Sequence, residues 1–227
     1  MTFKVDILES EMLNHNVKRF VTTRPENYNY EPGQAAELTL TREGYRGEPR
    51  PFTFTSIPED ENLEFIIKLY YDRDGVTDEM SSVEKGEQFE LSEPKGALRY
   101  EGPGVFIAGG AGITPFVSMF RQLKAEGELD QSVLWFSNQT PQDLFLEQEL
   151  KETFTEPGAL TLLVSEAPAD SEYTVGKIDQ AFLEQNSNRL QEGFVYVCGP
   201  PEMTEEIIGL VQDLGVEEQM IVSEDWS

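Results

Sequence analysis

The spacing of hydrophobic residues changes once along the chain, close to residue 100. Before that point, short alternating or β-branched runs are separated by turn-forming residues such as Glu31-Pro32-Gly33 and Asp74-Gly75. These runs predict strands at 3–8, 17–22, 36–41, 52–56, 63–70 and 89–91. Short strands at regular spacing, without a helix of ordinary length between them, favour a six-stranded antiparallel Greek-key barrel.

After residue 102 the pattern becomes an alternation of strands and helices. Hydrophobic runs predict strands at 105–108, 133–136, 160–164, 194–197 and 220–222, and hydrophobic stripes with helical spacing follow at 116–123, 146–154 and 203–214. This alternation is typical of a doubly wound parallel sheet. We therefore expect two domains, 1–101 and 102–227, with a hinge at 101–104.

A glycine-rich turn follows the first strand of the second half. Small residues at 108–112 allow a ligand to approach the backbone, and Thr114 and Pro115 suit the cap and first position of a helix. A helix N-terminus at the carboxyl end of a parallel strand is a place where diphosphates bind. The same residues also suit a tight packing turn without a ligand, so both interpretations stay open.

A second turn of this kind, Cys198-Gly199-Pro200, ends a later strand and begins another helix. The two turns would form opposite walls of one crevice, with Cys198 pointing into it. A lone cysteine is otherwise most often a small buried hydrophobe. No nearby base or second cysteine in the sequence supports a thiolate nucleophile.

Residues 50–56, Arg-Pro-Phe-Thr-Phe-Thr-Ser, place a guanidinium and an aromatic ring two positions apart on one predicted strand. Side chains two apart in a strand face the same side, and arginine can bind a phosphate with two hydrogen bonds. Alternating Thr and Phe is also ordinary strand sequence, so this segment alone does not decide between a ligand site and a simple strand.

Charge and composition narrow the classes of function. The 227 residues, 38% of them hydrophobic, are enough for packed domains. Forty-three acidic and 17 basic residues give a net charge of −26. Nucleic acids and anionic membranes both require clustered Lys and Arg, so neither is an expected partner.

Cysteine and histidine are scarce, since Cys198 and His15 are the sole examples of each. An internal disulfide, an iron–sulfur cluster or a His-rich metal centre cannot be built from this chain alone, so we expect no metal. The N-terminus has no signal-peptide pattern, and no segment approaches the roughly 20 apolar residues of a membrane span. The expectation is a soluble cytoplasmic protein.

Four motifs in order resemble those of the ferredoxin–NADP reductase superfamily, in its flavodoxin reductase and cytochrome b5 reductase-like branch. Residues 50–53 resemble the Arg-x-Tyr-Ser/Thr flavin motif, and residues 65–70 resemble the strand that follows it. Residues 74–77 fall where the family has a second phosphate turn, and 109–115 with 198–200 match the two nicotinamide motifs. The resemblance implies an FAD-binding barrel followed by an NAD(P)-binding domain.

The resemblance also implies roles for single residues. Arg50 binds the flavin pyrophosphate, Phe52 packs on the isoalloxazine, and Thr53 hydrogen-bonds near N5. Thr114 lies between flavin and nicotinamide, and Glu224 helps to shape the nicotinamide pocket. Thr53, Thr114 and Cys198 are thus the candidate catalytic residues. The remaining residues implied for FAD are Pro51, Ile66, Ile67, Lys68, Tyr70, Gly75, Val76, Thr77 and Trp226. Those implied for NAD(P) are Gly109, Gly110, Ala111, Gly112, Cys198, Gly199 and Pro200.

The sequence departs from the family pattern at three places. Phe52 replaces the usual tyrosine, which keeps the stacking surface and removes a hydroxyl. Residues 137–139 (Ser-Asn-Gln) lack the arginine that many members place on the 2′-phosphate of NADPH, which favours NADH. Trp226 either stacks on the flavin or is a frayed hydrophobic end. The family branch favours FAD over FMN.

The implied activity is hydride transfer from NADH or NADPH to FAD, with electrons passed on to a carrier protein such as ferredoxin or flavodoxin, or to a small acceptor. One alternative is a non-catalytic flavin-bound electron-transfer subunit of a larger complex, and another is a ferric or free-flavin reductase. The acidic charge bears on the acceptor, because ferredoxins and flavodoxins are themselves acidic. Either the few bases cluster at the flavin edge, or the acceptor is not strongly acidic.

Overall fold

The computed structural model describes residues 1–72, 74–96, 98–129, 131–168 and 173–224. The predicted flavin residue Trp226 lies outside these residues. The chain divides into two compact units, which are described separately here. Unit 1 contains residues 1–99 and 114–122, and unit 2 contains residues 100–113 and 123–227.

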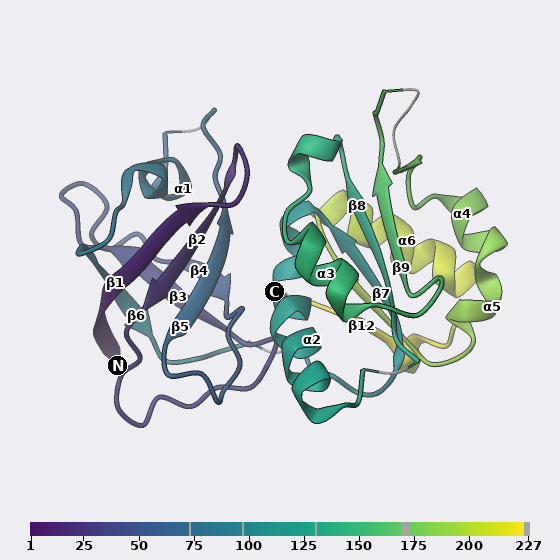
Figure 1. Cartoon of the computed structure of the whole chain (residues 1–227), viewed down its shortest axis with the longest axis horizontal. Helices are drawn as coiled ribbons and strands as arrows, with labels where there is room; N and C mark the ends of the chain where they lie inside the picture. Colours follow the sequence, from purple (N-terminus) through teal and green to yellow (C-terminus); the bar gives the residue numbers. More distant parts are fainter. Residues whose placement is uncertain (73, 97, 130, 169–172, 225–227) are drawn as a thin grey trace. The chain divides into compact units, whose positions relative to one another are not determined.

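Unit 1 is built on an antiparallel sheet of six strands in the order β4-β3-β6-β1-β2-β5, which confirms the predicted barrel (Figure 1). Its strands are β1 (Thr2–Met12), β2 (Val17–Thr22), β3 (Ala35–Leu40), β4 (Arg50–Thr53), β5 (Leu63–Lys68) and β6 (Gln88–Ser92). Alternate residues of β2 and β3 are buried, as a sheet with one face on a core requires. Phe20, Phe54, Phe65 and Phe89 are fully buried in that core.

The barrel closes where β4 ends. The sequence predicted a strand over 52–56, whereas β4 covers Arg50–Thr53, so that prediction is wrong in its second half. The Phe54 amide still donates to the Gln34 carbonyl beside β3, but the Thr55 amide donates to the Glu64 carbonyl of β5 at 2.9 Å. The chain therefore changes partner between these two residues, and consecutive side chains from Thr53 to Ser56 become buried.

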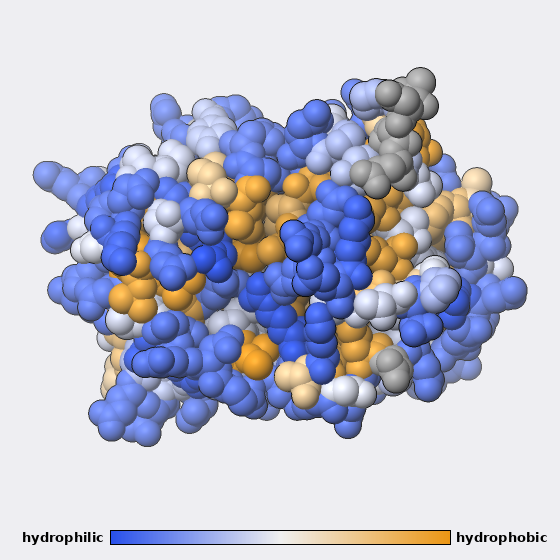
Figure 2. Space-filling model, in the orientation of Figure 1, coloured by the Kyte–Doolittle hydropathy of each residue, from blue (hydrophilic) through white to orange (hydrophobic). Residues whose placement is uncertain are grey.

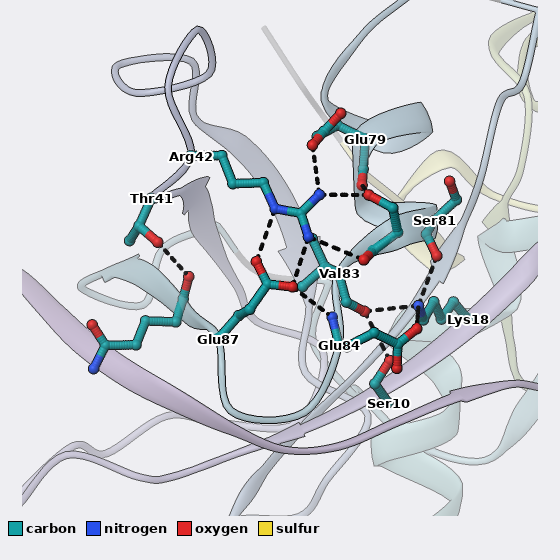
Figure 3. A network of polar contacts seen from close by, with 11 residues as sticks. Ser10, Lys18, Thr41, Arg42, Glu79, Ser81, Val83, Glu84 and Glu87 are labelled. Carbon is teal, nitrogen blue, oxygen red and sulfur yellow. Dashed lines mark hydrogen bonds and ion pairs between the residues drawn. The ribbon is translucent and has the colours of Figure 1, made fainter.

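Two cations hold a short helical segment against this barrel. The segment comprises α1 (Val76–Glu79) and η1 (Met80–Ser82), neither of which the sequence predicted. Arg42 pairs with Glu79 and Glu87, and the buried Lys18 amine donates to the Ser81 and Val83 carbonyls (Figure 3). Hydrogen bonding to Arg42 lowers the pKa of Glu87. These contacts join β2 and β3 to the segment before β6.

Unit 2 is built on a parallel sheet in the order β10-β9-β8-β7-β11-β12, which confirms the predicted doubly wound domain. Its strands are β7 (Gly104–Gly109), β8 (Val133–Asn138), β9 (Leu160–Val164), β10 (Thr174–Val175), β11 (Phe194–Cys198) and β12 (Ile221–Ser223). All six residues of β7 are buried, as expected for a central strand covered on both faces. The ring of Phe106 stacks on Tyr196 with centroids 4.2 Å apart.

Helices and helical turns connect these strands. They are η2 (Gly110–Ile113), α2 (Thr114–Glu126), η3 (Pro141–Asp143), α3 (Glu147–Thr153), α4 (Gln180–Gln185), α5 (Ser187–Leu190), α6 (Pro201–Asp213) and η4 (Glu218–Met220). The hydrophobic stripes predicted α2, α3 and α6. They did not predict α4 and α5, because helices of six and four residues are too short to show a hydrophobic period. In α6, Ile207 and Val211 are the buried residues of the predicted stripe.

The predicted hinge at 101–104 is tied to unit 2. The Tyr196 hydroxyl accepts hydrogen bonds from the Glu101 and Gly102 amides and donates to the Gly102 carbonyl at 2.8 Å. A Cβ atom on Gly104 would lie 1.9 Å from the Phe194 carbonyl oxygen. The segment is therefore fixed to β11 at both ends.

Acidic and other polar residues dominate the exposed surface. The face in Figure 2 is mainly hydrophilic, and hydrophobic residues gather there in limited patches. Exposed large hydrophobic residues include Met12, Tyr70 and Tyr71. Among the described residues, no helix combines the length and the hydrophobicity that crossing a bilayer requires.

Candidate functional site

The predicted phosphate-binding arginine is accessible. Arg50 begins β4, at one end of the sheet order, and its side chain is 48% exposed. It donates to the Pro49 carbonyl at 2.9 Å and lies 3.5 Å from the similarly exposed Glu48 carboxylate. An exposed pair at that distance contributes little, so Arg50 can turn to a stronger anion such as a diphosphate.

Phe52 and Thr53 continue β4 in different environments. Phe52 is half-buried and packs against the barrel core, which leaves part of its ring open for stacking. Thr53 is 7% exposed, and its hydroxyl donates to the Thr114 hydroxyl at 2.8 Å. The structure thus brings together two of the three predicted catalytic residues, and both belong to unit 1. Pro51 between them is exposed.

Thr114 does not have the capping role predicted from sequence. Ile113 is the cap residue of α2, and Thr114 is the first helical residue, followed by Pro115 in the first turn. The Thr114 side chain instead accepts the hydrogen bond from Thr53. The prediction was wrong because the Thr114 hydroxyl hydrogen-bonds to Thr53, which is distant in the sequence, rather than to the backbone at the start of its own helix.

The second flavin strand offers mainly its backbone. Ile66 and Ile67 are 3% and 1% exposed, so their side chains are enclosed within the protein. Lys68 is half-buried, and its amine lies 6.0 Å from the ring centre of Tyr70, which is 44% exposed. Since β5 is the last strand in the sheet order, its outer edge is where a flavin could contact these residues.

The predicted phosphate turn precedes α1. Gly75 is extended, with φ −169°, and Val76 and Thr77 begin the helix. Val76 is 2% exposed and belongs to the barrel core, whereas Thr77 is half-buried. Val76 could therefore serve a ligand only through its backbone, and Thr77 could also use its hydroxyl.

The two glycine turns of unit 2 pack directly on each other. A Cβ on Gly112 would lie 2.3 Å from the Cys198 carbonyl oxygen, and one on Gly109 would lie 2.3 Å from the Met203 sulfur. They are therefore not opposite walls of an open crevice, as the sequence had suggested. Small residues are needed here because β7 and β11 are neighbours whose turns meet. Gly110 adopts φ +52°, and Gly110 and Ala111 remain half-exposed.

A cavity of about 230 Å³ lies beside the second turn, and Cys198, Gly199, Thr204 and Glu224 contribute to its lining. The Cys198 thiol donates to the Glu224 carboxylate at 3.5 Å. Burial raises the pKa of Cys198 well above its usual range, and the charge and hydrogen bond of Glu224 raise it further. Cys198 is therefore a protonated S–H group at neutral pH, not a thiolate. Pro200, next in the turn, is exposed.

Residues 137–139, at the end of β8, carry no positive charge that could bind a 2′-phosphate. Asn138 ends the strand and is 8% exposed, while Ser137 is half-buried and Gln139 exposed. These side chains are neutral hydrogen-bonding groups, which suit ribose hydroxyls better than a phosphate dianion.

The residues fit the groups that the sequence implied. The features available to hold FAD are the accessible guanidinium of Arg50, the partly open ring of Phe52 and the edge of strand β5. For a nicotinamide dinucleotide, the available features are a mainly apolar cavity with Cys198, Thr204 and Glu224 in its lining and the N-terminus of the 13-residue helix α6 beside it. Sequence reasoning missed the pairing of Arg121 in α2 with the Thr55 carbonyl and the Glu64 carboxylate, a second contact between this helix and the barrel.

Comparison with known proteins indicates the same two kinds of domain. Residues 2–105 match the family model of an FAD-binding domain, and residues 106–208 match that of the oxidoreductase NAD-binding domain. The chain is 24% identical over 227 residues to the ferredoxin–NAD(P)+ reductase component of the naphthalene 1,2-dioxygenase system from Pseudomonas putida, covering 97% of this chain and 68% of that protein.

Two further similarities extend the comparison. NADH-cytochrome b5 reductase 1 from Mycosarcoma maydis is 29% identical, and the match covers 77% of this chain and 56% of that protein. The crystal structure of a ferredoxin NADP+ reductase from Neisseria gonorrhoeae, with bound FAD and NADP, has a TM-score of 0.82 at 21% identity and covers 98% of each chain. The Neisseria gonorrhoeae structure therefore shows that this chain has the same fold as that reductase.

The two family models together cover residues 2–208, so the chain joins an FAD-binding domain to an NAD-binding domain. It belongs to the flavin- and nicotinamide-dependent oxidoreductases of the ferredoxin–NADP reductase superfamily, as the four sequence motifs predicted.

Proposed function

We propose that this chain transfers a hydride from NADH to FAD and passes the electrons to a redox carrier protein. Residues 1–101 would hold the flavin, and residues 102–227 the dinucleotide. The observation that carries the proposal is the 2.8 Å hydrogen bond between Thr53 and Thr114. It joins the strand that bears the flavin motif to the helix that directly follows the nicotinamide turn.

Bound FAD supplies the chemistry, since it accepts a hydride from reduced nicotinamide and releases electrons to an acceptor. Arg50 binds the pyrophosphate, and the open part of the Phe52 ring packs on the isoalloxazine. The Thr53 hydroxyl donates to Thr114, which fixes its oxygen where it would face the flavin in this proposal. The backbone of residues 66–70, the end of β5 and the two residues after it, would line the flavin edge.

On the nicotinamide side, the chain supplies shape and neutral polar groups. Thr114 and the residues 109–112 approach the dinucleotide, and Cys198 with Glu224 borders the cavity where the nicotinamide is held. Because the Cys198 pKa is raised, the thiol stays protonated and donates a hydrogen bond to Glu224 rather than attacking the ring. These residues orient the nicotinamide and exclude water, and no acid or base is needed for hydride transfer.

The preferred donor in this proposal is NADH. A 2′-phosphate at the end of β8 would meet Ser137, Asn138 and Gln139, none of which carries a positive charge. Desolvating a dianion without a cation is costly, whereas neutral side chains can bind ribose hydroxyls. Both nucleotides occur among the similar proteins named above.

The acceptor is proposed as a one-electron carrier protein. The reductases named above act, by their names, with ferredoxin or cytochrome b5. With a net charge of −26, this chain would repel a strongly acidic carrier at low salt. We therefore propose a carrier with little negative charge on its docking face, or one that meets the chain in concentrated salt.

Stopped-flow mixing of the FAD-loaded chain with NADH or NADPH, without oxygen, tests the donor. We expect NADH to bleach the flavin with the higher rate constant per unit concentration. Ser137→Arg, which adds the missing cation, should raise the rate with NADPH and leave that with NADH nearly unchanged. A faster reaction of the unaltered chain with NADPH would refute the proposed preference.

A further inference from the structure

Helix α2 is attached to the barrel at a second point beyond the Thr53–Thr114 pair. The guanidinium of Arg121 donates to the Thr55 carbonyl at 2.7 Å and to the Glu64 carboxylate at 2.6 Å. Residues 114–122 belong to the same compact unit as the barrel, so both attachments lie inside unit 1.

The two attachments use one face of the helix and neighbouring residues at the end of β4. Thr114 and Arg121 are seven residues apart, which is two helical turns and about 10 Å along the axis. On the barrel side, Thr53 ends β4, and Thr55 follows where the chain has changed partner to β5. Ser118 lies between Thr114 and Arg121 on that face and is fully buried. The small side chain allows the helix to lie close to its neighbours.

Glu64 is the anchor for the second attachment. Its side chain is 12% exposed, and it also accepts a hydrogen bond from the fully buried Thr55 hydroxyl at 2.8 Å. Arg19 approaches its other oxygen at 3.3 Å. Several charge-assisted contacts to one mostly buried carboxylate hold it more firmly than an exposed pair would.

We infer that Arg121 is a positioning residue for hydride transfer. With Glu64 and Thr55 it fixes the direction of α2 on the barrel, and so holds Thr114 against Thr53. The buried residues 116–120 already pack α2 in place, and the two polar attachments, two turns apart, fix how the helix is set against the barrel. The inference rests on the proposed function, in which Thr53 and Thr114 lie where flavin and nicotinamide meet. Hydride transfer is sensitive to displacements of about 1 Å.

Arg42 provides a matched control. Its side chain is 26% exposed against 25% for Arg121, and it also binds glutamates within unit 1. Its contacts with Glu79 and Glu87 hold α1 and η1 rather than α2. In the proposed function α1 faces a flavin phosphate, so a loss from Arg42→Gln is expected in FAD affinity and not in the rate of flavin reduction at saturating FAD. Arg42→Gln and Arg121→Gln therefore remove the same charge from similar depths of the same unit, and we expect similar losses of melting temperature from both.

The test measures FAD content, the rate of flavin reduction by NADH, and hydrogen exchange of the peptide covering α2 without nucleotide. Both variants should bind one FAD. Arg121→Gln should slow flavin reduction at least about tenfold, whereas Arg42→Gln should stay within about twofold of the unaltered chain. Exchange in α2 should rise for Arg121→Gln alone. Combined with Thr114→Ala, Arg121→Gln should add little further slowing, because both changes act through one contact.

Equal reduction rates in the two arginine variants would overturn the inference, and so would full additivity with Thr114→Ala. If Arg121→Gln does not fold, Arg121→Lys is judged by the same outcomes: it keeps the charge, but its amine ends one bond short of Nη1, the atom that donates to both Thr55 and Glu64. An unaltered chain that binds no FAD, or whose flavin NADH does not reduce, would instead refute the proposed function.

Discussion

At the scale of single residues, Arg50 has fewer and weaker partners than Arg24, Arg42 and Arg121 of the same unit. Arg24 donates to three backbone carbonyls, and Arg42 and Arg121 bind mostly buried glutamates. Arg50 has one carbonyl and one distant, half-exposed carboxylate as partners. In a chain with 17 bases and 43 acids, a cation kept accessible on β4 is well suited to bind an anionic ligand.

Replacing Arg50 by glutamine should weaken FAD binding about 10- to 100-fold, because a charge-assisted contact with phosphate contributes about 1.5–3 kcal/mol. Titration of the apoprotein with FAD, followed by flavin fluorescence, measures the change. Arg46→Gln is the control, since Arg46 is exposed in the loop that leads to β4 and donates to the Thr41 carbonyl. Equal affinities in the two variants would remove Arg50 from the site.

Cys198 gives a pH-dependent prediction. Because the native pKa is raised, the unfolded chain releases the thiol proton above about pH 8.5 while the native chain retains it. The free energy of unfolding should therefore fall as pH rises from 8.5 to 10, by up to about 1.4 kcal/mol per unit. Below pH 8.5 this group should have no effect.

Cys198→Ser is the matched variant, since serine keeps a donor for Glu224 and does not titrate. The part of the pH slope that comes from Cys198 should disappear in it, so the slope between about pH 8.5 and 9.5 should be clearly smaller than in the unaltered chain. Tyr30 and Tyr196, whose pKa values burial raises to about 12, add a slope that grows as pH approaches about 10, where an unfolded tyrosine is half ionised, and this part is the same in both chains. Urea unfolding at several pH values measures both slopes, and parallel slopes would contradict the account.

At the scale of elements, the glycine turns show how packing and ligand binding impose the same sequence requirement. Gly112 must lack a side chain because the Cys198 carbonyl lies where its Cβ would be. The turn would need glycine there even without a dinucleotide. The packing interpretation of the sequence is therefore correct for Gly109 and Gly112, and it is compatible with a ligand at the half-exposed Gly110 and Ala111.

Gly112→Ala should destabilise unit 2 by about 1–3 kcal/mol or more, because a backbone carbonyl must move to admit the methyl group. Gly209→Ala is the control within the same unit. Gly209 lies in α6 with open space around it, so alanine should stabilise by about 0.5–1 kcal/mol. Urea unfolding followed by the fluorescence of the buried Trp135 measures both. A neutral Gly112→Ala would contradict the packing described here.

Hydrophobic periodicity was sufficient to predict both sheets, because their strands bury alternate or continuous apolar runs. It failed at residues 54–56, where the chain changes strand partner in order to close the barrel, and at α1, α4 and α5, which are too short to show a period. The family motifs indicated Arg50, Thr53 and Thr114. No local signal could indicate Arg121 and Glu64, because their pairing depends on how α2 lies on β5.

At the scale of the whole molecule, the net charge of −26 opposes the compact state. Acidic residues outnumber basic ones by 43 to 17, so the negative charge of the surface is far from balanced by the basic side chains. Repulsion between the carboxylates is long-ranged at low ionic strength and is screened by salt.

Raising KCl from 0.1 to 1 M shortens the screening length from about 10 to about 3 Å, so the melting temperature should rise by several degrees. NaCl at equal concentration should act alike if the effect is screening rather than a specific potassium site. Differential scanning calorimetry measures both. A melting temperature that is constant or falls with salt would show that surface repulsion does not limit stability.

The central claim is that these units form one flavin enzyme driven by reduced nicotinamide. The most direct measurement is the absorbance spectrum of the purified chain after incubation with FAD and desalting, followed by anaerobic addition of NADH. The account predicts a yellow protein with one FAD per chain, whose flavin absorbance is lost on reduction. A chain that stays colourless after incubation with FAD, or a bound flavin that neither NADH nor NADPH reduces, would contradict it.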